Sequence, residues 1–182
     1  MAKKLYIQAS KPFIEVKLKP SDSSEKDVTF GLRLYGLKEK ADIDKKFAGF
    51  IEDNEKYVAA LAKMQDEELL ATIPAEERAT LMQDALNYVK LYEDYRINRL
   101  KEDILYVKDA TISIFDEENM VTSLVIKDTR KVDPLADFWE TSSEALTVIL
   151  DSFLDNKQWK DTLLNKHEEV LSTDFKGEQV KN

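Results

Sequence analysis

The fold is decided in the stretch Asp27–Phe47, DVTFGLRLYGLKEKADIDKKF, where the period of the apolar residues changes. In its first part apolar and polar side chains alternate, with Val28, Phe30 and Leu32 on one face, as in a β-strand with one covered face. After Gly36 the apolar residues recur every three or four positions, as along one side of an α-helix. The stretch therefore predicts a strand followed directly by a helix.

A second alternating segment lies upstream, in KPFIEVKLK, where Ile14, Val16 and Leu18 alternate with charged residues. The polar loop PSDSSEKD, opened by Pro20, separates it from the first strand. We expect the two strands to form an antiparallel hairpin with one apolar face and one face in water. Thr29 would lie on the wet face.

The helix after the hairpin has an apolar seam with one polar interruption. Its members follow steps of three, four or seven and are Ile43, Phe47, Phe50, Tyr57, Leu61 and Met64. Asn54 occupies the missing seam position. Either Asn54 is a buried polar residue in one long or kinked helix, or the stretch EDNE separates two shorter helices, since Asp and Asn also favour caps and turns.

A further helix is predicted from TIPAEE, with Thr72 as its cap, Pro74 near the first turn and two acids suited to the helix N-terminus. Its seam is Leu81, Ala85, Tyr88, Tyr92 and Tyr95. The tyrosine spacing fits a packed helix face better than a platform for stacking bases, because the neighbouring charges are of mixed sign.

A second hairpin and two helices complete the chain. Residues 111–115 and 121–127 are rich in β-branched residues and predict the hairpin. The helices are expected in EALTVILDSFL and KQWKDTLLNKHEEVL. The fold class is therefore α+β and mostly helical, with two antiparallel hairpins, a long helical middle and a C-terminal helical pair. Pro134 marks the boundary between a body, 1–132, and a helical region, 133–182, packed on it as one unit. Whether the hairpins share one sheet stays open.

Composition excludes several kinds of function. The chain has 182 residues, a net charge of -9, one histidine and no cysteine. Without cysteine there is no disulfide and no thiolate site, and a reducing cytoplasm is the expected compartment. The acidic balance opposes binding to phosphate backbones, so nucleic acid is not an expected partner. No segment approaches the apolar length that a bilayer requires, so no membrane association is expected.

Three motifs resemble chemical sites but lack essential residues. GLRLYGLK has two glycines at phosphate-loop spacing, but Leu37 stands where the loop requires lysine. DIDKKF begins like a calcium loop, but Phe47 stands where the sharp turn requires glycine. His167-Glu168 begins like a zinc-protease motif without a second histidine. We therefore expect no enzyme activity and no catalytic, metal or cofactor site, and we expect His167 to face solvent.

The C-terminal region Ser142–Asn182 resembles that of tail assembly chaperones of long-tailed bacteriophages. The resemblance rests on an apolar helix that ends in an LD corner and on a tryptophan that opens the next helix in the form W-(K/R)-D-x-L. In this chain the latter residues are Trp159, Lys160, Asp161 and Leu163. The upstream hairpins and long helix match nothing definite in the family.

The resemblance implies a non-enzymatic protein of the bacterial host cytoplasm that binds the tape measure protein and assists assembly of tail tube subunits. The residues expected to contact a partner are Trp139, Phe153, Trp159, Asp161 and Leu163. The tryptophans and Phe153 can equally pack the joint of the terminal helices. Two alternative functions remain: a structural component of the tail or head-tail connector, and an acidic inhibitor that mimics nucleic acid. The oligomeric state stays open.

Overall fold

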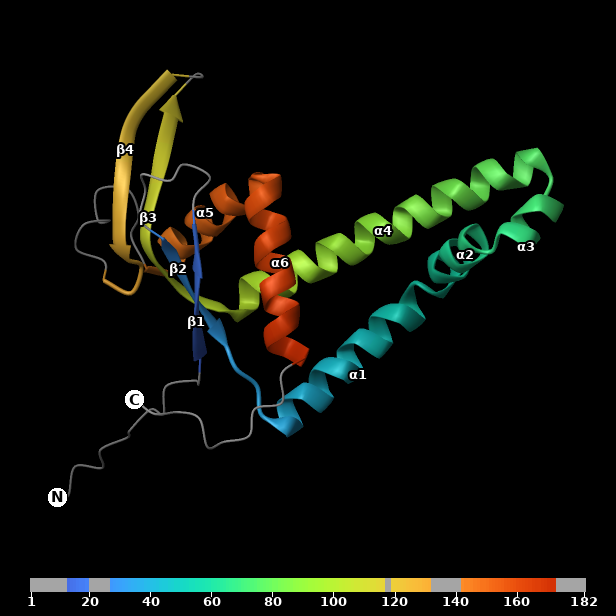
Figure 1. The fold of residues 1–182 in the computed structure, drawn as a ribbon, viewed down its shortest axis with the longest axis horizontal. Helices are drawn as coiled ribbons and strands as arrows, with labels where there is room; N and C mark the ends of the chain where they lie inside the picture. The colour runs from blue at the N-terminus through green and yellow to red at the C-terminus, as the bar shows by residue number, and fades with distance from the viewer. Residues whose placement is uncertain (1–12, 20–26, 117–118, 132–141, 173–182) are drawn as a thin grey trace. The chain divides into compact units, whose positions relative to one another are not determined.

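The chain forms two compact units in the computed structural model (Figure 1). The residues that the structure describes are 13–19, 27–116, 119–131 and 142–172. Unit 1 comprises Met1–Tyr35 and Leu100–Asn182, and unit 2 comprises Gly36–Arg99. The sequence places a boundary after residue 132, whereas the contacts place the boundaries at either end of unit 2, because its helices pack mainly on one another.

Unit 1 contains a four-stranded antiparallel sheet with strand order β1-β2-β3-β4. Its strands are β1 (Phe13–Leu18), β2 (Val28–Arg33), β3 (Ile104–Asp116) and β4 (Asn119–Asp128). Pairing of β2 with β3 joins the two hairpins into one sheet. The prediction of a mostly helical α+β fold with two antiparallel hairpins is confirmed. Unit 2 is an insertion in the connection between β2 and β3.

The prediction of a wet face on β2 is wrong. Thr29 and Gly31 are both buried, although they alternate with the apolar residues. The reason is that β2 lies inside the sheet and the ring of Tyr106, from β3, covers Gly31. A β-carbon at Gly31 would overlap that ring, so glycine is required by the close approach.

The third strand begins at Ile104, earlier than the predicted Thr111. No loop precedes it, because the helix α4 ends at Asp103. The residues missed include Tyr106 and Val107, which are almost fully buried on the two faces of the sheet. Their continuous apolar character gives no alternation from which a strand could be recognised.

The two C-terminal helices form as predicted and supply much of the core of unit 1. They are α5 (Ser142–Asp155) and α6 (Lys157–Ser172). Phe30 of β2 makes an edge-to-face contact with Phe153 of α5, with ring centroids 5.4 Å apart. Fully or almost fully buried residues come from both sheet and helices and include Phe30, Leu32, Val107, Ala145, Ile149, Leu163 and Leu164.

Unit 2 is a helical hairpin made by α1 (Leu37–Asp53), α2 (Glu55–Gln65), α3 (Glu67–Thr72) and most of α4 (Ala75–Asp103). The predicted seam forms, because Phe47 and Phe50 of α1 contact tyrosines of α4. Phe50 and Tyr95 stack with centroids 4.6 Å apart. Tyr88 and its neighbours therefore pack against another helix, as the spacing predicted.

The alternatives at Asn54 resolve as two helices that meet at this one residue. The Asn54 side chain donates to the carbonyl of Phe50 at 2.8 Å, while its own carbonyl accepts from the amide of Tyr57 at 2.9 Å. The side chain is half-buried and closes α1 while the backbone opens α2. The residue is thus both a seam member and a helix break.

The predicted cap at Thr72 is wrong, because Thr72 is the last residue of the additional short helix α3. Its hydroxyl donates back to the carbonyl of Leu69 at 2.7 Å. The short helix α3 has its own cap, Asp66, which accepts from the Leu69 amide at 2.9 Å. Arg78 donates to the carbonyls of Ala71 and Ile73, so the end of α3 is held by the first turns of α4.

Candidate functional site

Trp159 lies at the joint of the two C-terminal helices. Asn156, between the helices, accepts from the Trp159 amide at 3.2 Å and so caps α6. The indole ring contacts Phe153 at 4.9 Å and Phe30 at 6.2 Å between centroids. The side chain is half-buried, and its remaining surface lines a small pocket with Leu18, Lys19, Gln158 and Thr162. Trp159 therefore closes the joint and also leaves an accessible edge.

The other residues predicted to contact a partner lie in different surroundings. Phe153 and Leu163 are buried in unit 1, with exposed fractions of 8% and 0%. Asp161 is exposed on α6. Trp139 lies outside the residues that the structure describes. Of the four members of the predicted set that the structure describes, Trp159 and Asp161 are placed where another molecule could touch them without rearrangement of the core.

The prediction that His167 faces solvent is wrong. His167 is 3% exposed and its Nε2 lies 2.7 Å from Oδ2 of Asp103, which is itself 1% exposed. The hydroxyl of Tyr35, also buried, donates to the other oxygen of the Asp103 carboxylate. The three side chains join the end of β2, the end of α4 and α6. The physical reason is that a buried carboxylate requires hydrogen-bond partners, and the histidine and tyrosine supply them.

This buried network contains a histidine-carboxylate pair, which is the pair that general-base catalysis uses. All three side chains are nine-tenths or more buried, so a substrate has no access to them in the described conformation. The arrangement therefore holds three elements of unit 1 together. A signal for it was present in the sequence, because His167 follows Leu163 by four residues and so shares its side of the helix.

Charged residues cover the face of the sheet at Tyr106. Glu15 accepts from the Tyr106 hydroxyl at 2.7 Å and from Lys108 at 2.6 Å. The hydrogen bond from Lys108 lowers the pKa of Glu15, and burial together with Glu15 raises the pKa of Tyr106. Arg130 lies 3.9 Å over the Tyr106 ring and pairs with Asp128 at 2.7 Å. Because these charged side chains pair with one another, the cluster covers Tyr106 on this face of the sheet, and we do not consider it a candidate binding site.

No candidate metal or membrane site was found within the described residues. Among these residues there is no group of three or more histidine, aspartate or glutamate side chains that could hold a metal ion. None of the helices in the described ranges is long and apolar enough to cross a membrane.

Unit 2 has few fully buried side chains. Within Gly36–Arg99, all of which the structure describes, only Ala60 and Ala85 are buried. Large apolar side chains that are exposed in the same range are Leu37, Phe47, Leu69, Met82, Leu86, Val89 and Leu91. A helical hairpin covers each helix on one side only, so it has little interior of its own.

An open groove lies near the connection between α3 and α4. Its volume is about 370 Å³, and Leu69, Ile73 and Leu81 provide apolar lining. Glu77 and Asp84 add two carboxylates to the same lining, and Lys63 adds one ammonium group. The combination of apolar surface and carboxylates suits an apolar segment of a protein that also carries basic residues.

Charge is distributed unequally along the hairpin. Residues 52–84, which we call the acidic half, carry nine acidic and three basic side chains. The rest of unit 2, residues 36–51 and 85–99, carries seven basic and five acidic side chains, and we call it the basic half. The pair Lys56-Asp84, at 2.9 Å, ties α2 to α4 within the acidic half and raises the pKa of Lys56. The groove thus lies in the acidic half.

No family model, no curated protein and no solved structure matches the chain. The functional site must therefore be assigned from the arrangement, burial and charge of the described residues. The buried network and the sheet cluster are internally satisfied, whereas unit 2 presents apolar surface, an open groove and unbalanced charge. The surface of unit 2 is the candidate functional site.

Proposed function

We propose that the protein is a non-enzymatic binding protein that holds an apolar, helical and partly basic segment of another protein on unit 2. The observation that carries this proposal is the exposure of large apolar side chains throughout Gly36–Arg99, where only two alanines are buried. Contiguous exposed apolar surface is typical of protein-binding sites. Its acidic half would attract basic side chains that flank an apolar segment.

We further propose that the partner is a phage tape measure protein and that the chain acts as a tail assembly chaperone that assists tail tube assembly. Support comes from the resemblance of the C-terminal region, carried by Trp159, Asp161 and Leu163. The helical binding surface is compatible with this role, because a long helical client needs its apolar faces covered before assembly. In this proposal unit 1 supplies the folded base, and the exposed edge of Trp159 is a secondary contact.

The proposal can be tested by capture from bacteria that produce the phage. A tagged full-length chain is expected to recover the tape measure protein and the tail tube protein, both identified by mass spectrometry. The chain should be missing from purified virions, because a chaperone leaves before completion. Recovery of neither protein would contradict the assignment, and presence of the chain in virions would favour a structural tail component.

A variant pair tests whether the groove is the contact. Leu69, which is 41% exposed, lines the groove, whereas Ala71 is an exposed residue of the same helix that is not among the lining residues. Leu69→Glu is expected to reduce capture strongly, because it places a charge against an apolar segment. Ala71→Glu adds the same charge nearby and should leave capture unchanged. Equal capture by both variants would place the contact elsewhere.

A further inference from the structure

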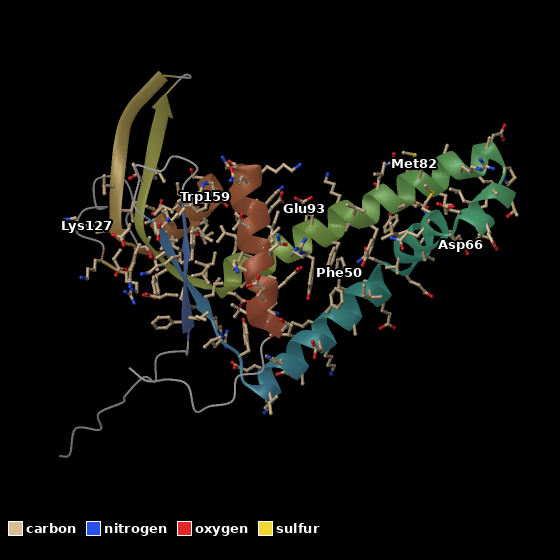
Figure 2. The ribbon with its side chains drawn as sticks, in the orientation of Figure 1. Phe50, Asp66, Met82, Glu93, Lys127 and Trp159 are labelled. Carbon is tan, nitrogen blue, oxygen red and sulfur yellow. The ribbon has the colours of Figure 1, made fainter. Side chains whose placement is uncertain are left out.

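The helix α4 has a second apolar face that the hairpin does not use. Met82, Leu86 and Val89 follow one another by four and three residues, so they lie on one side of the helix. Their exposed fractions are 54%, 52% and 50%. We call these three residues the α4 stripe. Figure 2 shows Met82 on α4 and Phe50 on the facing side of α1.

The α4 stripe is separate from the seam of the hairpin. Ala85 is buried, and Tyr88 contacts Phe50 of α1, so these two residues mark the side of α4 that faces the hairpin partner. Successive residues of a helix are about 100° apart, so Leu86 points well away from Ala85, whereas Val89, four residues after Ala85, borders the seam. A surface helix normally has one apolar face toward its core and polar residues opposite. The α4 stripe is therefore apolar surface that packing within the hairpin leaves about half exposed.

We propose that the α4 stripe is a self-association surface, on which α4 of one copy packs antiparallel against α4 of a second copy. Two helical hairpins joined in this way form a four-helix arrangement, which gives the outer face of each α4 the cover that a single hairpin does not provide.

The position of the stripe favours a second copy as the occupant. Leu86 lies close to the middle of the α4 residues that belong to unit 2, residues 75–99. A two-fold axis through Leu86 brings the stripe of one copy onto the stripe of the other, as an interface between identical surfaces requires. With the stripe at one end of the helix, such a pair would overlap along only part of each α4.

Charge sets the direction of packing. An antiparallel pair places the acidic half of each hairpin, with nine acidic and three basic residues, beside the basic half of the other, with seven basic and five acidic residues. A parallel pair would place the two acidic halves side by side. Like charges repel and opposite charges attract across an interface, so the antiparallel pair is favoured.

The stripe and the groove are distinct surfaces of unit 2. None of the three stripe residues is among those that line the groove, where α4 contributes Glu77, Thr80, Leu81 and Asp84. Self-association therefore leaves the groove open to another protein. It also does not depend on the proposed partner, because it requires only this chain.

Sedimentation velocity of the full-length chain over a wide range of concentration tests the proposal. The wild type is expected to shift from monomer to dimer as concentration rises. Leu86→Lys places two lysines together at the two-fold axis and should raise the dissociation constant by at least about tenfold, since like charges repel across an interface. Leu91→Lys is the matched control, because Leu91 is an exposed leucine of α4 outside the stripe.

Wild type that stays monomeric at every concentration would overturn the proposal, and so would equal weakening by Leu86→Lys and Leu91→Lys. Both substitutions retain a good helix former at an exposed position, so circular dichroism should show the same helix content for all three proteins. A dimer lost only in Leu86→Lys supports the stripe as the interface.

Cross-linking determines the direction of packing, and the absence of cysteine makes single labels possible. Leu86→Cys is expected to form an intermolecular disulfide on oxidation, because Leu86 meets its own copy at the axis. Glu68→Cys, in α3, should not cross-link, because antiparallel packing holds the two α3 helices apart. A disulfide from Glu68→Cys in addition to one from Leu86→Cys would show parallel packing and contradict the antiparallel pair.

Discussion

The two units of the molecule use their apolar residues in different ways. In unit 1, Phe30, Leu32 and Leu163 are fully buried between a sheet and two helices. In unit 2, the large apolar side chains of a helical hairpin are half-buried or exposed, and only Ala60 and Ala85 are buried. The proposed function therefore assigns stability and binding to different parts of one short chain. A unit with its own core can carry an inserted hairpin whose surface is open to another protein.

The largest expected difference between the units comes from removal of an aromatic ring. Phe30→Ala in unit 1 should lower the free energy of unfolding by about 3–5 kcal/mol, because it leaves a cavity in a packed core. Phe50→Ala in unit 2 should lower the free energy of unfolding clearly less, because the Phe50 ring is only half-buried and its removal loses fewer packing contacts. Urea denaturation followed by circular dichroism measures both. A larger loss from Phe50→Ala would remove the contrast between the units.

The next effect concerns the buried network. His167→Ala removes a hydrogen-bond partner of the buried Asp103 carboxylate, and we expect a loss of about 1.5–3 kcal/mol, the range for hydrogen bonds to charged groups. Lys166→Ala, which breaks an exposed pair with Glu169 on the same helix, should cost at most about 1 kcal/mol. Thermal unfolding of both variants distinguishes them. Equal losses would mean that His167 has no special role in unit 1.

Replacing glycine by alanine is expected to lower the free energy of unfolding in unit 1 and to raise it in unit 2. Gly31→Ala in unit 1 forces a β-carbon into the Tyr106 ring and should destabilise by about 1–3 kcal/mol. Gly49→Ala in α1 meets no atom within 4 Å and should stabilise by about 0.5–1 kcal/mol, since alanine favours a helix interior. The midpoints of urea denaturation measure both changes. The same sign for both would contradict the described packing around Gly31.

The smallest effect depends on pH. The hydrogen bond from Lys108 makes the pKa of Glu15 lower in the folded chain than its ordinary value of 4.5. A lowered pKa contributes stability above the unfolded pKa, and this contribution is lost as pH falls through the folded pKa. Wild type should therefore exceed Glu15→Gln in urea midpoint at neutral pH, and the difference should shrink in acid. A difference that grows in acid would contradict the sign.

Sequence alone predicted the elements whose period is clear. Alternation in the first two strands and the helical seam of Phe47, Phe50 and Tyr95 predicted both the strands and the packed helix face. The first part of β3 was missed because Tyr106 and Val107 are apolar on both faces of the sheet, which removes alternation as a signal. Pairing of the two hairpins through β2 and β3 is a long-range contact that local patterns do not encode.

The candidate site was harder to predict from the sequence than the fold. A helix with apolar residues at Met82, Leu86 and Val89 looks the same whether these residues are covered or exposed, because burial depends on the other elements of the fold. His167 was assigned to solvent because its neighbours in sequence are charged. Because His167 follows Leu163 by four residues, it lies on the same side of α6 as that buried leucine. Its partner Asp103 lies on another element, however, so the network could not be predicted from local sequence.

Amide hydrogen exchange of the full-length chain, measured alone and in the complex captured from phage-producing cells, tests most directly whether unit 2 is the binding surface. Local stability determines exchange, so a bound segment gains protection. We predict slower exchange within Gly36–Arg99, strongest around the groove at Leu69 and Leu81, with little change in the core of unit 1. Protection gained only around Trp159 and Asp161, with Gly36–Arg99 unchanged, would contradict the account.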